Sequence, residues 1–242
     1  MLEATAFGAL GSSALLVGAG LTYWLRPSRV VIGCVMAFGA GTLISAVAFE
    51  LVLDIIEMDR PVHLAVGLSL GALAFFAGDL WIDSRGGAAR KRSTGEQANG
   101  SPLAIVLGTL LDGVPESFIL GLTVVTGGGV SFAFLAAVFL SNLPESMAAS
   151  YGLEKAGWKR SNTVWMWTAL VVLSAGSAAL GFAIFSAMPT LEGAVVQAFA
   201  AGALLTMLAD TMMPEAFEFS GKAVGLFTVL GFGVAIAISS LE

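Results

Sequence analysis

Only one cysteine, Cys34, occurs in the 242 residues, so an intrachain disulfide and a cysteine-based metal site are both excluded. Charge is also scarce: 12% of the residues are charged and 57% are hydrophobic, about half the charged fraction of soluble domains. A net charge of −6 leaves no basic surface for nucleic acid. The longest polar stretch is only a loop. These absences indicate a protein whose solvent is the lipid bilayer.

The chain instead contains apolar runs separated by short polar or Gly/Pro-rich breaks, and each run can cross the roughly 30 Å hydrocarbon core as a helix. We therefore predict an all-α polytopic membrane protein, a single integral membrane domain over residues 1–242 with eight transmembrane helices. Residues 84–102 are predicted to form a flexible cytoplasmic loop. The expected spans are about residues 4–25, 30–54, 63–83, 103–125, 130–152, 163–187, 193–219 and 222–240.

The basic residues are distributed unevenly between the predicted loops. Ten of the eleven lie in odd-numbered loops, and Arg60 is the exception. Because basic residues collect on the cytoplasmic side of a membrane, the odd loops are predicted to be cytoplasmic. Both termini are then extracytoplasmic, and we expect an integral protein of the plasma (inner) membrane. A homodimer stays an open alternative.

Two spans share a sequence pattern. Residues 38–48 read FGAGTLISAVA and residues 199–209 read FAAGALLTMLA, with Phe, Ala, Gly, Leu and Ala at matching offsets. The predicted topology gives these segments opposite directions in the membrane. Inverted repeats of this kind are typical of secondary transporters, so we expect a 3+2+3 arrangement of the spans. Convergence of small-residue packing motifs is the alternative explanation.

The two spans between these repeats carry a related acidic signature. Residues 112–117 read DGVPES and residues 141–146 read SNLPES. Asp112 and Glu116 are four residues apart and share one helix face, as do Asn142 and Glu145 at a spacing of three. Both groups fall near the middle of their spans. The sequence therefore predicts oxygen ligands from two helices at one depth.

Carboxylates at that depth need compensation, because an unpaired one costs about 2.5–3.5 kcal/mol at the bilayer centre. No lysine or arginine lies within a predicted span core. Pro115 and Pro144 each free a backbone carbonyl nearby, as in the cation sites of transporters. We expect a cation site; a pair of protonated, hydrogen-bonded acids that stabilise helix packing is the alternative.

This pattern resembles the ZIP (Zrt/Irt-like) family of divalent metal permeases over the whole chain, from the eight spans and outside termini to the two Pro-Glu signatures. The resemblance implies a midplane metal site between spans four and five and transport of divalent cations into the cytoplasm. Carried over by position, Glu116 and Glu145 match the family's bridging carboxylates. Asp112 stands where the family usually has His, and Ser141 stands where it usually has His or Gln. Asn142 stands where the family has an acid or Asn.

The departures from the family bear on the choice of metal. The only histidine, His63, lies at the outer start of span three, so the site contains oxygen donors alone. Such a site suits Mn, Mg or Ca better than an imidazole-bearing site does, and it weakens strict zinc selectivity. Gly113 replaces a usual Asn, and Ser174 lies where some members place another carboxylate, so we predict one main site.

Other acids are candidates for the entrance and the exit of the predicted cation path. Glu50 and Asp54 are four residues apart near the outer end of span two and are candidates for a cation entrance, with an interfacial position as the alternative. Asp210 and Glu215 lie in DTMMPEA, which is similar to the family's inner segment, and are candidate exit-route ligands.

The predicted function is therefore transport of a divalent metal cation of the zinc, iron or manganese class, held by Asp112, Glu116, Asn142 and Glu145. The transported ion is the substrate, no cofactor is expected, and the protein is not expected to be an enzyme. A metal-binding membrane sensor without transport activity and a proton-coupled transporter of another solute are the alternatives.

Overall fold

The computed structural model describes residues 1–84, 102–125, 132–187 and 190–241. Within these ranges the chain is helical and contains no strand. The predicted loop at 84–102 lies almost wholly outside the described residues, as does the segment at 126–131. The helices are α1 (Leu2–Leu25), α2 (Arg29–Ala46), a π-helix η1 (Val47–Val52), α3 (Leu53–Glu57), α4 (Pro61–Ile82), α5 (Pro102–Thr123), α6 (Phe132–Lys155), α7 (Arg160–Ala187), α8 (Thr190–Met207), a second π-helix η4 (Leu208–Met212), α9 (Met213–Ser220) and α10 (Ala223–Ser239).

Six of these helical segments, found within the described ranges, are long and apolar enough to cross a membrane. They include the continuous rods 29–57 and 193–220, in each of which a π-helix joins two α-helical parts. α5 has 22 residues, and α10 is shorter at 17. Large apolar side chains such as Leu73, Leu226 and Val229 are exposed on the surface of the bundle. This surface is typical of a protein embedded in lipid, so the all-α membrane class is confirmed.

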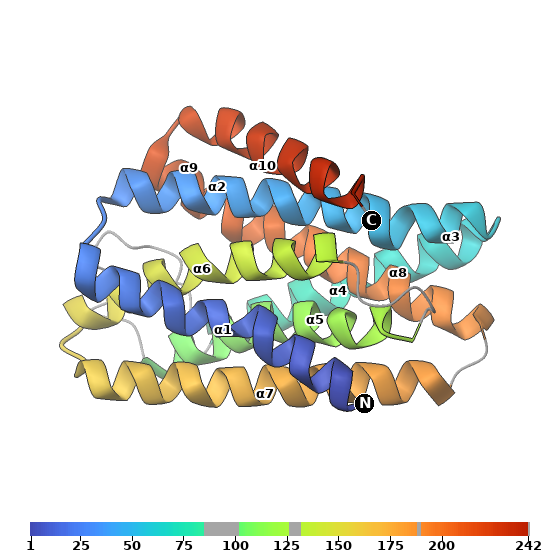
Figure 1. The fold of residues 1–242 in the computed structure, drawn as a ribbon, viewed down its shortest axis with the longest axis horizontal. Helices are drawn as coiled ribbons and strands as arrows, with labels where there is room; N and C mark the ends of the chain where they lie inside the picture. The colour runs from blue at the N-terminus through green and yellow to red at the C-terminus, as the bar shows by residue number, and fades with distance from the viewer. Residues whose placement is uncertain (85–101, 126–131, 188–189, 242) are drawn as a thin grey trace.

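The helices lie side by side along one axis and alternate in direction, so the N-terminal end of α1 and the C-terminal end of α10 point to the same end of the bundle (Figure 1). The connections from α1 to α2, from α6 to α7 and from α9 to α10 lie at the opposite end. We call this opposite end the basic end. Its described basic residues are Arg26, Arg29, Lys155, Lys159, Arg160 and Lys222.

All five tryptophans and both tyrosines also lie at the basic end, within about two helical turns of its connections. These residues are Tyr23, Trp24, Trp81, Tyr151, Trp158, Trp165 and Trp167. Trp and Tyr concentrate at the boundary between hydrocarbon and lipid headgroups, because their rings are apolar and their N–H or O–H groups need water or a partner. The aromatic residues therefore mark the level of one membrane surface.

Glycines allow the helices to approach until backbones touch. A methyl group on Gly41 of α2 would collide with the carbonyl of Thr228 in α10, and one on Gly231 of α10 would collide with that of Phe38 in α2. The interface between α4 and α8 repeats the arrangement, with Gly71 against the carbonyl of Phe199 and Gly202 against that of Leu68. Small residues provide close van der Waals contact where lipid removes the usual hydrophobic driving force between helices.

A reciprocal contact of the same kind joins α5 to α7. Gly121 of α5 meets the carbonyl of Ala178, and Gly181 of α7 meets the carbonyl of Phe118. Within the described residues, these three helix pairs are thus joined by reciprocal contacts between a glycine and a backbone carbonyl.

Gly231→Ala should lower the free energy of unfolding by about 1–3 kcal/mol, because the added methyl group must displace the backbone of α2. Gly233→Ala is the matched control on the same helix, since open space surrounds Gly233. There the substitution should leave stability unchanged or slightly raise it through helix propensity. The midpoint of unfolding in detergent measures both; equal midpoints for the two variants would contradict a backbone contact at Gly231.

Candidate metal centre

The two Pro-Glu signatures lie in the middle of α5 and α6, and both helices continue through their prolines. Because a proline has no N–H, Pro144 leaves the carbonyl of Leu140 without its helical donor. The structure directs this carbonyl toward α2, where a methyl group built on Gly39 would lie 2.9 Å from the oxygen. The freed carbonyl of α6 thus lies against Gly39 of α2, and a role for it in binding a cation stays a prediction.

Glu116 is the most enclosed of the predicted ligands, with a side chain that is 0% exposed. Its carboxyl group accepts hydrogen bonds from two consecutive residues of α6: Ser141 Oγ lies 3.2 Å from Oε1 and Asn142 Nδ2 lies 3.1 Å from Oε2. Ser141 and Asn142 are themselves buried. Two helices are therefore linked through polar groups inside an otherwise apolar bundle.

Both donors are anchored on the same backbone atom. The carbonyl oxygen of Val138 accepts from Asn142 Nδ2 at 2.8 Å and lies 3.0 Å from Ser141 Oγ. Asn142 thus uses its amide nitrogen on Glu116 and Val138, which leaves its carbonyl oxygen as the atom that could bind a cation. We call Glu116, Ser141, Asn142 and the Val138 carbonyl the Glu116 cluster.

The Glu116 cluster fits both protonation states of Glu116. Ser141 has one hydroxyl hydrogen, yet its oxygen lies within hydrogen-bond distance of Glu116 and of the Val138 carbonyl. A charged Glu116 can accept that hydrogen. A neutral Glu116 can donate its own hydrogen to Ser141, which then donates to Val138. The heavy atoms need not move between the two arrangements.

Other acids interact electrostatically with Glu116 or with Glu145, which follows the cluster on α6. The charges of Asp112 and Glu116 reach Glu145, and so does that of Glu215 on α9. Asp112 also acts on Glu116 from the same helix. The predicted ligands on α5 and α6 are therefore gathered into one region, and Glu215 approaches it from a third helix.

The carboxylates do not converge on a single point in this conformation. Among residues 1–84, 102–125, 132–187 and 190–241, no group of three or more His, Cys, Asp or Glu side chains is arranged to hold a metal ion. Hydrogen bonds from Ser141 and Asn142 occupy the two oxygens of Glu116 instead. A bound cation would need to replace one of these contacts and draw a second carboxylate toward Glu116.

The remaining predicted residues lie apart from this region or at its edge. Ser174 is buried in α7, where its backbone carbonyl lies 3.1 Å from a methyl group built on Gly8 of α1, and its hydroxyl makes no hydrogen bond to Glu116. Asp210 is exposed on η4, whereas Glu215 is partly buried. Of the two candidate exit-route ligands, only Glu215 is brought toward Glu145.

Glu50 and Asp54 form a separate polar group around η1. Ser239 of α10 donates to Glu50 Oε1 at 2.9 Å, and Gln197 of α8 donates to Asp54 Oδ2 at 3.4 Å. Gln197 also donates to the backbone carbonyl of Leu51 at 3.0 Å. Gln197 was not among the residues predicted from the sequence. A single amide within the apolar run 193–209 was the available signal, because a buried polar side chain in lipid requires a partner.

An apolar cavity of about 450 Å³ lies directly beside the Pro115 turn of α5. Its walls include Phe118 of α5, Ile184 of α7 and Phe199 of α8. α5 is thus packed tightly on α7 but incompletely on α8, next to the residue that precedes Glu116.

No known family model and no curated protein matches this chain in a sequence comparison. The Glu116 cluster and its surrounding acids are therefore the features of the chain that indicate a function.

Asn142→Ala should lower the free energy of unfolding by about 1–3 kcal/mol, because it removes a donor from a fully buried carboxyl group. In a double-mutant cycle with Glu116→Ala, the two losses should be less than additive by about 1 kcal/mol. Unfolding midpoints of the four proteins in detergent provide the cycle. Strictly additive losses would show that the Asn142 to Glu116 hydrogen bond contributes nothing to the folded state.

Proposed function

We propose that this protein is a membrane permease for divalent metal cations and that the cation crosses the membrane through the Glu116 cluster. The observation that carries the proposal is a fully buried carboxyl group, held by Ser141 and Asn142 between two proline-interrupted helices, with further carboxylates acting on the same region. Buried acids inside a membrane bundle are costly and mark ion pathways. Oxygen donors at such a site favour a hard or borderline divalent cation.

The proposed architecture is that of the ZIP-like permeases: eight spans in a 3+2+3 arrangement, in which α5 and α6 form the central pair. Helix contacts support an inverted repeat. The packing of α4 on α8 corresponds to that of α10 on α2, the packing of α1 on α6 to that of α7 on α5, and the packing of α2 on α6 to that of α8 on α5. These are the equivalences expected if spans one to three repeat as spans six to eight.

Two further correspondences support the repeat. The π-helices η1 and η4 each begin nine residues after the first phenylalanine of the repeated segments, Phe38 and Phe199. The carbonyls of these two phenylalanines also contact glycines of the partner helices: Phe38 contacts Gly231, and Phe199 contacts Gly71. Convergence of small residues alone gives no reason for π-helices at equivalent positions.

Orientation follows from the distribution of charge. We place the basic end in the cytoplasm and both termini outside. Glu50 and Asp54 then lie toward the extracytoplasmic side of the membrane, and Glu215 lies on the cytoplasmic side of Glu145. A cation entering near η1 would meet carboxylates before, at and after the Glu116 cluster, and movement of the repeats against α5 and α6 would alternate its access.

Uptake into proteoliposomes tests the proposal with Zn, Mn, Fe, Co, Cd and Mg as substrates. Wild-type protein should transport at least one of these ions, and Glu116→Gln/Glu145→Gln should reduce that flux by about tenfold or more. Glu3→Gln/Glu57→Gln is the matched control, because it removes two exposed carboxylates by the same chemical change. Flux should be retained in this control.

Absence of flux for the whole panel, with wild-type protein shown to be folded, would reject the permease. Metal binding without flux would then indicate the sensor. Flux of another solute that follows pH but not metal would indicate a proton-coupled transporter. The Glu116 cluster gives this last candidate a specific basis, because it accommodates charged and neutral Glu116 without rearrangement.

Asp112→His tests which metals the site prefers. The substitution places an imidazole where the resembling family has one, so it should raise the ratio of zinc to manganese transport. Asp112→Asn removes the same charge while keeping an oxygen donor, and it should not raise that ratio. The ratio of initial uptake rates measures the effect; an equal change in both variants would mean that charge, and not ligand type, sets the preference.

A further inference from the structure

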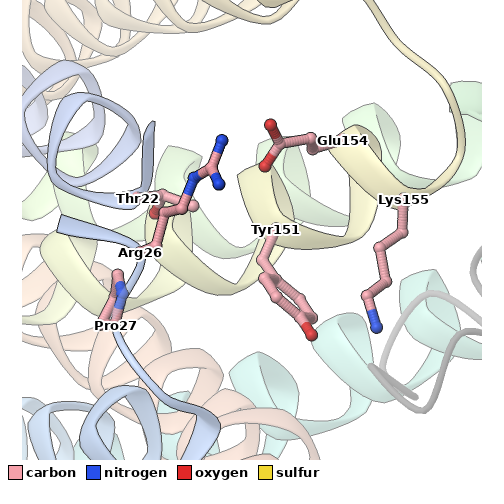
Figure 2. Close-up of a pocket in the computed structure, with 6 residues that line it drawn as sticks. All are labelled: Thr22, Arg26, Pro27, Tyr151, Glu154 and Lys155. Atoms are coloured by element: carbon pink, nitrogen blue, oxygen red, sulfur yellow. The ribbon is translucent and has the colours of Figure 1, made fainter. Parts of the chain in front are cut away.

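A pocket of about 320 Å³ opens between the C-terminal ends of α1 and α6 at the basic end. It lies far along α6 from the Glu116 cluster, outside the proposed ion path. Figure 2 shows Tyr151 and Lys155 leaving α6 on the same side, whereas the Arg26 side chain comes from α1 and points toward Glu154. The lining residues are Thr22, Arg26, Pro27, Tyr151, Glu154 and Lys155.

The pocket carries an excess of positive charge. Arg26 and Lys155 are its cations, and Glu154 is its carboxylate. The Glu154 carboxylate is already paired with Arg160, whose Nη2 lies 3.2 Å from Oε1. Arg160 therefore offsets part of the Glu154 charge, which leaves the pocket with two cations against one partly neutralised carboxylate.

Three local features shape the wall of the pocket. Arg26 ends α1 in the left-handed region, with φ 46° and ψ 56°, where glycine is the usual residue and a side chain is uncommon. Lys155 Nζ lies 4.8 Å from the centre of the Tyr151 ring, a cation–π distance that orients the ammonium group. The hydroxyl of Thr22 lies 3.0 Å from the carbonyl oxygen of Gly18 and 3.3 Å from that of Met147, and it thus brings α1 and α6 into contact beneath the pocket.

The depth of the pocket indicates the source of the anion. Tyr151 in its wall and the neighbouring Trp24, which is 90% exposed, belong to the aromatic residues that mark one membrane surface. Lipid phosphates are concentrated at this level, and basic pockets between membrane helices bind anionic headgroups. Arg presents a planar set of donors that matches phosphate oxygens, and Lys adds a point charge.

We propose that this pocket binds the phosphate of an anionic phospholipid headgroup between Arg26 and Lys155. The lipid would join the end of α1 to the end of α6, the helix that carries Ser141 and Asn142. Binding needs no metal transport, so the site can be tested independently of the proposed function.

The test is native mass spectrometry of protein released from nanodiscs that contain equal amounts of phosphatidylglycerol and phosphatidylcholine. Wild-type protein should retain phosphatidylglycerol, and Arg26→Gln/Lys155→Gln should lower its apparent affinity by about tenfold. Lys159→Gln/Lys222→Gln is the matched control, since it removes two exposed charges from the same end of the bundle, outside the pocket. The control should change the affinity less than about twofold.

Two further variants keep the test informative if the first is unstable. Arg26→Lys/Lys155→Arg preserves both charges and should retain the lipid. Glu154→Gln removes the carboxylate from the pocket and should increase retention, a gain that unfolding cannot produce. Equal losses in the pocket and control pairs, or no loss in either, would overturn the site. Two further results would together overturn the lipid assignment in favour of a soluble phosphate. These are binding of inorganic phosphate in pure phosphatidylcholine nanodiscs and displacement of phosphatidylglycerol by inorganic phosphate in the mixed nanodiscs.

Discussion

Inside hydrocarbon, each backbone N–H and C=O must find its partner within the protein, and the whole arrangement follows from this constraint. It makes the described chain helical, and it limits departures from the α-helix to places where another group replaces the missing partner. Gln197 supplies that replacement at η1 by donating to the carbonyl of Leu51. At Pro144, Gly39 covers the freed carbonyl of Leu140. The irregular points of the helices therefore coincide with contacts from neighbouring helices and lie close to the acids.

The same constraint explains why helix positions could be predicted from the sequence. Hydrophobic length determines where a span begins and ends, so the expected segment 4–25 corresponds to α1 at Leu2–Leu25 and the expected segment 163–187 to α7 at Arg160–Ala187. Spacing along a helix also placed Glu116, Ser141 and Asn142 at a common depth, where the structure brings them into contact.

Rotation of the helices about their axes was harder to predict. Lipid-facing and protein-facing sides of a span are both apolar, so hydrophobic periodicity does not reveal which side is buried. Asp210, for example, was predicted as an exit-route ligand from its place in DTMMPEA, and nothing in the sequence indicated that its side chain is exposed on η4. Gln197 and the two π-helices depend on contacts with distant parts of the chain, and local sequence contains no propensity that specifies them.

The reciprocal glycine contacts have a mechanical consequence. A contact between backbones has no side-chain rotamers that could absorb a displacement. The two helices in each of the pairs α2–α10, α4–α8 and α5–α7 are therefore expected to move together. The cavity beside Pro115 lies between the α5–α7 pair and α8, which belongs to the α4–α8 pair. A shift of one pair against the other would therefore change the space beside Pro115, one residue away from the buried Glu116.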